Sequence, residues 1–425
     1  MPESLCFHHG QLIDGTGRDP VPDGVVLTDT DGHITYAGPA DGAPDAGDAR
    51  RVDAAGGTIL PGFIDCHVHV FASGRWEPLA VAMAKFDDYR HLEAAVRLRQ
   101  TLLAGVTTVR DLGGTTPGMR RAVADGLIDG PRLLVSHGIL SHTGGHVDWT
   151  FPNGQAVERS DYAISALNHI VDSPQEAVVA TRQLVRSGVD VIKVCATGGM
   201  GSVSDDPDDQ GLTVEEMRAI HAELGRYHGR RLPIAAHAQG RRGIHNALIS
   251  GVRSIEHGYG IGEEECQLLI DSGAFLVPTL STMVFDPEDQ QRMPADYVRK
   301  KLGWIERGRE NIANAIDQGA SVALGTDAGA GPHGLNLREL GYLCDLGMTP
   351  HAAIQSGTRV GAELLELDDS IGTLEAGKLA DVVVYDGDAI ADIRGLGDAE
   401  RISHVATSGR LVKDAGTYRP RVLSI

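Results

Sequence analysis

The alternation of strand-like and helix-like segments along the middle of the chain constrains its fold more than any other feature. Segments with helical periodicity and polar faces occur at 88–103, 174–187, 213–227, 240–250 and 297–318. Between such segments we expect eight strands, at 58–70, 106–112, 132–140, 189–196, 232–238, 254–258, 275–280 and 321–326. Eight parallel strands each followed by a helix close into a barrel, which predicts an α/β fold of the (β/α)8 TIM type.

The two ends of the chain show no helical periodicity. Short strand-like runs fill residues 1–58, with an Asp31-Gly32 turn signal between two of them, and the same texture returns in residues 370–425. The simplest organisation is one small β-sandwich domain built from 1–58 and 370–425, with the barrel, 59–369, inserted between its halves.

The charge of the chain restricts its partners. It contains 58 acidic and 38 basic residues, a net charge of -20, which disfavours nucleic acid and anionic membranes. Neither a signal-peptide pattern nor a run of 18 apolar residues is present, so we expect a cytoplasmic protein. Its five cysteines are scattered without a Cys-x-x-Cys pair, which indicates reduced thiols.

A His-x-His pair lies near the end of the first expected strand. Because strand side chains alternate, His67 and His69 should lie on one face together with Asp65. Three polar side chains in so apolar a strand need partners, and a metal ion is one such partner. Two hydrogen-bonded histidines are the alternative, so other ligands must be sought downstream.

Side chains of the ligand or base type recur at the ends of four later strands. These are Lys193, His237, His257 and Asp327. Barrel enzymes place their chemistry at the carboxyl ends of the strands, so these residues should meet the His-x-His pair. Satisfied core histidines, a surface lysine and an aspartate capping its own turn are the structural alternatives.

Three segments carry a resemblance to a known family. They are Pro-Gly-Phe-Ile-Asp-Cys-His-Val-His at 61–69, Ile-Lys-Val-Cys-Ala-Thr-Gly-Gly at 192–199 and Ile-Gly-Thr-Leu-Glu-Ala-Gly-Lys-Leu-Ala-Asp at 371–381. With them the chain resembles the amidohydrolase superfamily over essentially its whole length. Within that superfamily it is similar to the binuclear, prolidase-like and imidazolonepropionase-related subgroup.

The resemblance implies a two-metal site. His67, His69 and Asp327 would hold one divalent cation, His237 and His257 the second, and carbamylated Lys193 would bridge the two. Zinc is the expected metal because it suits imidazole and carboxylate ligands. An unmodified lysine ammonium would be repelled by two dications, whereas a carbamate is an anionic bridge. A homo-oligomer acting on a small-molecule substrate is expected with it.

The implied reaction is hydrolysis of an amide C–N bond, in a dipeptide or an N-acyl amino acid, by a hydroxide that bridges the metals. Asp327 would accept its proton and pass it to the leaving amine. Substrate contacts are expected from the loop 141–149, which contains His142, His146 and Trp149. The resemblance gives His146 the role of hydrogen-bonding the substrate carbonyl; a histidine that only organises its own loop is the alternative.

One position departs from the subgroup. Its dipeptidases often have a tyrosine two residues after the histidine of the fifth strand, where this chain has Gln239. An amide can bind a carboxylate but adds no charge, so specificity for a free C-terminal acid is not implied. The nearby cations Arg241 and Arg242 could compensate, or could simply be solvated at a helix start.

Three alternatives to the dipeptidase interpretation follow from the sequence. A mononuclear zinc deaminase would share most ligands, but Gln239 and Gly240 offer no proton-shuttling glutamate. A cyclic-amide hydrolase and a metal-free scaffold on the same barrel are the others. The acidic, glycine-rich segment 199–211 is long for a strand-to-helix connection, which is typical of a lid or of an exposed loop.

Overall fold

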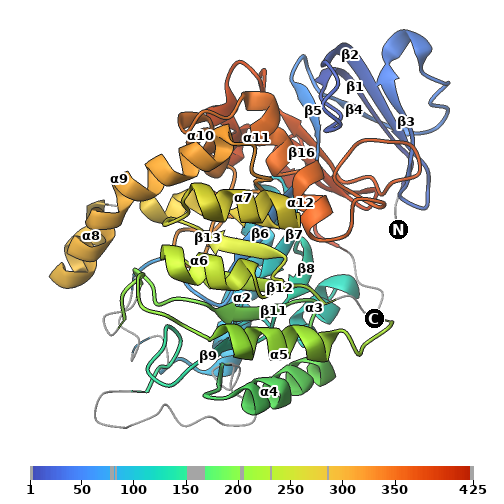
Figure 1. Ribbon diagram of the computed structural model, residues 1–425. Coiled ribbons are helices and arrows are strands. Elements are labelled where there is room, and N and C mark those ends of the chain that lie inside the picture. The colour runs from blue at the N-terminus through green and yellow to red at the C-terminus, as the bar shows by residue number, and fades with distance from the viewer. Residues whose placement is uncertain are drawn as a thin grey trace.

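The computed structural model describes residues 3–76, 81, 84–150, 168–201, 205–229, 232–284 and 287–421. Within these ranges the strands form one mostly antiparallel sheet and two parallel sheets, with helices packed around the parallel ones (Figure 1). None of the helices in this described part of the chain has the length and hydropathy of a membrane span.

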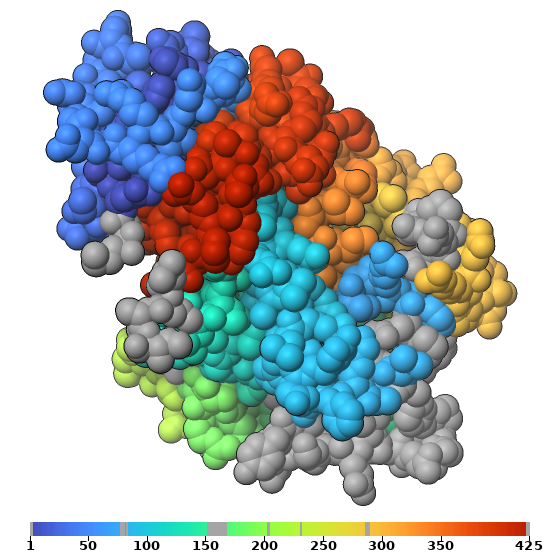
Figure 2. Space-filling view, turned by 180° about the vertical axis from the view of Figure 1, so that it is seen from behind, coloured from blue at the N-terminus to red at the C-terminus, as the bar shows by residue number. Residues whose placement is uncertain are grey.

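Both chain ends enter a single sheet of nine strands, which we call the terminal sheet. Its strands are β1 (Leu5–Leu12), β2 (Val21–Thr28), β3 (Ile34–Pro39), β4 (Arg50–Asp53), β5 (Thr58–Pro61), β15 (Val382–Tyr385), β16 (Ile402–Thr407), β17 (Arg410–Asp414) and β18 (Thr417–Tyr418). Their order is β18-β17-β16-β15-β5-β1-β2-β3, and β4 also pairs with β1. The two chain ends meet where β15 pairs antiparallel with β5. Figure 2 shows the blue N-terminal and red C-terminal residues side by side.

The expected β-sandwich is therefore one hydrogen-bonded sheet within the described residues. A shared core explains why the two ends fold together: Phe7, Ile59, Val382 and Leu411 belong to one cluster of buried side chains. Burial of such apolar area is the main favourable term in folding, and neither end alone would enclose this cluster.

The parallel strands form a three-stranded and a six-stranded sheet. The first contains β6 (Phe63–Val68), β7 (Val106–Asp111) and β8 (Arg132–Val135). The second contains β9 (Ile139–Ser141), β10 (His169–Ile170), β11 (Ile192–Cys195), β12 (Ile234–Ala238), β13 (Ser254–His257) and β14 (Phe275–Val277), in the order β10-β9-β11-β12-β13-β14. The expected strand 58–70 is split between β5 and β6, and 132–140 is split between β8 and β9.

The segment 321–328 corrects the expected eighth strand. It makes isolated bridges rather than a ladder on each side: Ala323 N donates to Leu276 O at 3.0 Å, and Cys66 N donates to Leu324 O at 2.9 Å. The segment thus lies between β14 and β6. On the other side of the three-stranded sheet, Asp190 N, two residues before β11, donates to Val135 O of β8 at 2.9 Å.

The described α-helices are α2 (Asp87–Leu103), α3 (Pro117–Ala124), α4 (Pro174–Ser187), α5 (Val214–Leu224), α6 (Arg241–Leu248), α7 (Glu263–Ser272), α8 (Pro287–Arg292), α9 (Ala295–Asp317), α10 (Arg338–Asp345), α11 (Pro350–Ser356) and α12 (Arg359–Leu364). Figure 1 shows α4, α5, α6 and α7 stacked in that order along one side of the parallel strands. Local signals fix their ends. Thr213 and Glu216 form a capping box at the start of α5, and Gly188, with φ +92°, ends α4.

Candidate metal centre

Three of the expected ligands lie together at the ends of β6 and of the segment 321–326. His67 is the fifth residue of β6 and His69 follows its end, while Asp327 follows Thr326. His67 Nε2 is 3.6 Å and His69 Nε2 is 3.3 Å from Asp327 Oδ1. One ligand atom from each residue lies within 4.8 Å of the others. This spacing allows all three atoms to bind one cation.

Asp65 takes a supporting position instead. Its carboxylate accepts hydrogen bonds from Thr326 Oγ1 at 2.6 Å and from Asn336 Nδ2 at 2.7 Å. Burial nevertheless raises the pKa of Asp65 to about 6. These bonds tie β6 to the residue that precedes Asp327, so Asp65 holds the two ligand-bearing segments at a fixed separation.

His237 and His257 extend the cluster from the neighbouring strands β12 and β13. The His257 ring centroid is 5.0 Å from that of His67 and 4.6 Å from that of His237. Both side chains are buried, each 4% exposed. Burial, as the first cause, lowers the pKa of each well below its usual value, so both are neutral imidazoles able to ligate a metal.

Each of the four histidines has one ring nitrogen bonded to the protein. His69 Nδ1 lies 3.0 Å from Gly113 O, and His237 Nε2 lies 2.9 Å from Gly198 O. A carbonyl oxygen only accepts, so these nitrogens carry the proton and the other nitrogen of each ring keeps its lone pair. His257 Nδ1 is 2.8 Å from Thr279 Oγ1. Partners of this kind orient metal-binding histidines.

Lys193 lies on β11 among these groups. It is 2% exposed, and its Nζ has no hydrogen-bond partner among the described residues. Burial lowers the pKa of Lys193, and the charge of Lys193 is, after burial, the next cause that lowers the pKa of His67. A buried amine without a partner is costly, which indicates that a further group completes its surroundings.

The backbone is strained at three positions of the centre. His257, Thr279 and Asp327 have φ values of 71°, 48° and 56°, in the left-handed region that favours glycine. Such conformations persist where the surroundings over-determine them, and they concentrate at functional sites. Here they turn two expected ligands, and the threonine that orients one of them, out of the regular strand direction.

Asp327 has the position of a metal ligand and an unusually high pKa. Burial raises its pKa to about 7, against the lowering effect of Lys193, His146 and Lys301. Without bound cations, the buried carboxyl group of Asp327 therefore holds its proton more strongly than an exposed aspartate does.

Glu256 and Arg110 support the centre and were missed from the sequence. Glu256 Oε2 is 2.8 Å from His67 Nδ1, and its Oε1 accepts from Arg110 Nη2 at 2.9 Å. The two side chains are 0% and 1% exposed. The signal that could have found them is one charge of each sign within the expected strands, Arg110 in Val106–Asp111 and Glu256 in Ser254–His257, since buried charges are paired.

His146 lies against the centre, and Gln239 lies beside it. The His146 ring stacks on His237 with centroids 4.1 Å apart, and His146 Nδ1 is 3.0 Å from Asp205 Oδ2. Gln239 Oε1 accepts from Met200 N at 3.0 Å, so its amide holds the start of the segment 199–211. Residues 202–204 of that segment lie outside the described residues.

His142 and Trp149 are not joined to the cluster. His142 Nδ1 bonds to Thr143 O at 2.8 Å, and Trp149 is 37% exposed. Across the described ranges no hydrogen bond or ring contact links either residue to the expected ligands. Their expected contact with substrate therefore has no support in the geometry of the centre.

The donor set fits divalent cations. Four imidazoles with a free ring nitrogen, one carboxylate and one unpartnered amine converge from β6, β11, β12, β13 and the segment after Thr326. Imidazole and carboxylate ligands suit zinc and similar metals. Bound cations at such a centre could activate water and polarise a carbonyl or phosphoryl oxygen.

Comparisons with known proteins extend over nearly the whole chain. The family model described as "Amidohydrolase family" matches residues 58–412. Ochratoxinase from Aspergillus niger is 30% identical over 374 residues, which cover 84% of this chain and 76% of that protein. The crystal structure of a Xaa-Pro dipeptidase with bound methionine in the active site has a TM-score of 0.86 and 30% identity, covering 96% of this chain and 100% of that one. A prolidase complexed with N-methylphosphonate-L-proline has a TM-score of 0.89 and 30% identity, covering 97% and 100%.

Proposed function

This chain belongs to the amidohydrolase family, and from that membership we propose that it is a metal-dependent hydrolase of an amide C–N bond in a small substrate. One observation carries the proposal. His67 Nε2, His69 Nε2 and an oxygen of Asp327 lie close enough to share a cation, while the opposite nitrogen of each histidine is bonded to the protein.

We propose the following ligand sets. His67, His69 and Asp327 hold one divalent cation, with zinc as the expected metal, and His237 and His257 hold the second. The support is the ring contact that places His257 between His67 and His237. The two sets are then close enough for one bridging group from β11.

Lys193 is the proposed bridge after carbamylation. Its neutral amine would add to carbon dioxide, forming an N–C bond and releasing one proton, and the product is a two-oxygen anion. Two features of Lys193 favour this: burial lowers its pKa, which increases the neutral amine, and its Nζ has no partner among the described residues. An anion there would also remove the repulsion between a lysine ammonium and two dications.

The bound cations would supply an activated water and polarisation of the scissile carbonyl. The residues of the chain do the rest. Asp327 would accept the proton of the attacking water and deliver it to the leaving amine, acting first as a general base and then as a general acid. His146, held by Asp205 and stacked on His237, would orient the substrate carbonyl.

Dipeptides and N-acyl amino acids are the proposed substrates. The support is the similarity to a Xaa-Pro dipeptidase and to a prolidase that binds a proline-containing phosphonate. Because Gln239 Oε1 is bonded to Met200 N, a contact of Gln239 with substrate would use its amide NH2 group. Selectivity for a free carboxylate would then depend on other residues.

We also propose that the parallel strands and the segment 321–328 close into a barrel occupying 59–369. The hydrogen bonds of that segment to both β14 and β6 support closure on one side. The bond from Asp190 N to Val135 O supports it on the other.

The proposed function is tested by assaying Xaa-Pro, Xaa-Arg and N-acyl amino acid substrates before chelation, after chelation and after zinc is restored. Turnover of at least one class should vanish on chelation and return with zinc. Asp327→Asn should lower kcat by about 10²–10⁴, the range of a lost general acid–base group. Release of ammonia rather than a carboxylic acid product would instead identify a deaminase, and metal-independent turnover would contradict the proposal.

A further inference from the structure

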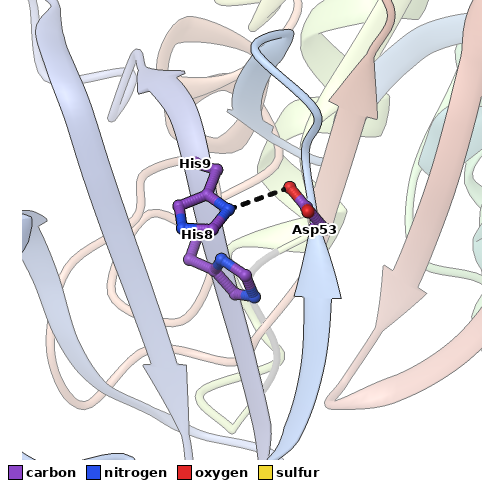
Figure 3. A group of neighbouring side chains, drawn as sticks. All are labelled: His8, His9 and Asp53. Carbon is purple, nitrogen blue, oxygen red and sulfur yellow. Dashed lines mark ion pairs between the residues drawn. The ribbon is translucent and has the colours of Figure 1, made fainter.

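A second group of metal-binding side chains lies in the terminal sheet, on strands that carry none of the proposed catalytic ligands. One ring nitrogen of His8, one of His9 and a carboxylate oxygen of Asp53 lie within 4.8 Å of one another. His8 and His9 are in β1 and Asp53 ends β4. Figure 3 shows the two imidazole rings next to each other beside the end of β4, with His9 Nδ1 directed at Asp53.

A local break in β1 brings these side chains together. His8 is the direct partner of Asp53 in the parallel pairing of β1 with β4, so those two side chains share a face. In a regular strand His9 would point to the opposite face. Instead His9 has φ 57°, and the ring centroids of His8 and His9 are only 4.2 Å apart. The left-handed conformation of His9 therefore places both imidazoles on the side of Asp53.

The polar atoms of this group are incompletely satisfied. His9 Nδ1 lies 3.3 Å from Asp53 Oδ1. His8 Nε2 is buried, and the described residues provide no hydrogen-bond partner for it. The side chains of His9 and Asp53 are 67% and 59% exposed, so an ion in solution can reach them. A buried ring nitrogen without a partner leaves His8 incompletely satisfied, next to two donors that an ion in solution can reach.

Another group with similar spacing is a weaker candidate because its carboxylate already has a cationic partner. His245, Glu264 and Glu265 also have ligand atoms within 4.8 Å. There, however, Arg241 Nε donates to Glu265 Oε2 at 2.7 Å. There a guanidinium already neutralises the carboxylate, whereas the ion pair of Asp53 is with His9, which leaves the group on β1 and β4 as the stronger candidate.

We propose that His8, His9 and Asp53 form a third metal site, which binds one zinc-class divalent cation at the protein surface and links β1 to β4. Two imidazoles and one carboxylate suit Zn²⁺, with water completing its coordination. The role of such a site is structural, because a cation held by both strands stabilises their pairing by binding only the folded sheet. Its affinity should be lower than that of the centre at His67 because two of its ligands are largely exposed.

The test titrates Zn²⁺ into the holoenzyme by calorimetry, with its catalytic cations in place and loosely held metal removed by dialysis. His9→Asn is the diagnostic variant, since asparagine tolerates a positive φ and the backbone is retained. Asp53→Asn removes the carboxylate. His33→Asn is the matched control: in the connection between β2 and β3, His33 pairs with Asp29 at 3.9 Å, and the described residues supply no third ligand there.

The wild type and His33→Asn should each bind one additional Zn²⁺ per chain, and Zn²⁺ should raise their thermal midpoints. His9→Asn and Asp53→Asn should bind that ion at least tenfold more weakly, with turnover by the catalytic centre unchanged. The proposal is overturned if the wild type takes up no additional ion at millimolar free Zn²⁺. It is equally overturned if His9→Asn binds as tightly as the wild type, because the ion then lies elsewhere.

Discussion

Replacing Glu256 by Gln should remove two roles of one buried carboxylate at the same time. One oxygen of Glu256 contacts His67 Nδ1 at 2.8 Å, and the other accepts from Arg110 at 2.9 Å. Glutamine keeps the volume of the side chain but removes its charge. His67 then loses an anionic partner, and Arg110 becomes a buried cation without a counter-charge.

The two losses have different magnitudes. With Arg110 and Glu256 only 1% and 0% exposed, breaking their pair from one side should cost about 3–5 kcal/mol of stability. Loss of the partner that orients a metal-binding histidine typically lowers metal affinity or activity by about 10–100-fold. Glu256→Gln should therefore lower both stability and metal affinity. A second substitution is needed to tell the two effects apart.

The double variant Arg110→Met, Glu256→Gln provides that separation. Removing both charges should restore most of the lost stability, because no uncompensated charge remains buried. Metal affinity should stay low, since the carboxylate on His67 is still missing. Glu223→Gln is a control: Glu223 is 7% exposed and pairs with Arg182 and Arg226, and its loss should leave metal affinity unchanged.

Urea unfolding of the metal-free protein and competition with a chelator measure the two quantities. The structural argument is refuted if Glu256→Gln binds metal within twofold of the wild type. It is also refuted if the double variant is as unstable as the sum of the two single variants, because the charges would then not interact.

Three further predictions follow from individual contacts. Lys193→Ala should abolish turnover, and millimolar propionate should restore part of it by supplying a carboxylate at the bridging position. The control is Lys413→Ala, which removes a buried lysine of β17 and should keep turnover. Burial raises the pKa of Glu339 to about 8. The protonated group therefore stabilises the folded protein fully at pH values below the pKa of Glu339 in the unfolded chain, and this stabilisation is lost as the pH rises through 8. Glu339→Gln should therefore reduce the fall in urea midpoint between about pH 5 and pH 9, and an unchanged fall would contradict this assignment. A methyl group at Gly325 would overlap Val277 and lie 3.0 Å from His67 Cβ. Gly325→Ala should therefore lower the free energy of unfolding by about 1–3 kcal/mol and weaken metal binding. Gly303→Ala, where a methyl group would enter open space, should do neither.

The sequence predicted the arrangement of the fold well where a pattern was periodic. Helical periodicity at 174–187 matches α4, because Ser173, Pro174 and Gly188 mark both its ends. The pattern was less informative at 321–326, where an apolar run does not reveal that the segment makes isolated bridges instead of a ladder. It was also less informative at 58–70, where Gly62 divides one apolar run between the terminal sheet and β6.

The candidate site was predictable where the ligand types are rare in strands. His67, His69, His237, His257 and Asp327 stood out for that reason. Glu256 was overlooked beside His257, because strand alternation places adjacent side chains on opposite faces and the φ of 71° at His257 cannot be seen in the sequence. The partner of Gln239, Met200 N, comes from a loop whose path no local pattern encodes.

The number of divalent cations that the chain retains tests the central claim most directly. The measurement is elemental analysis of natively prepared protein, in a His9→Asn background so that the proposed surface site does not contribute. We predict about two cations per chain, and their loss in Lys193→Ala, as a shared bridge between two metals requires. About one cation per chain, with metal content unaffected by Lys193→Ala, would contradict the two-metal account.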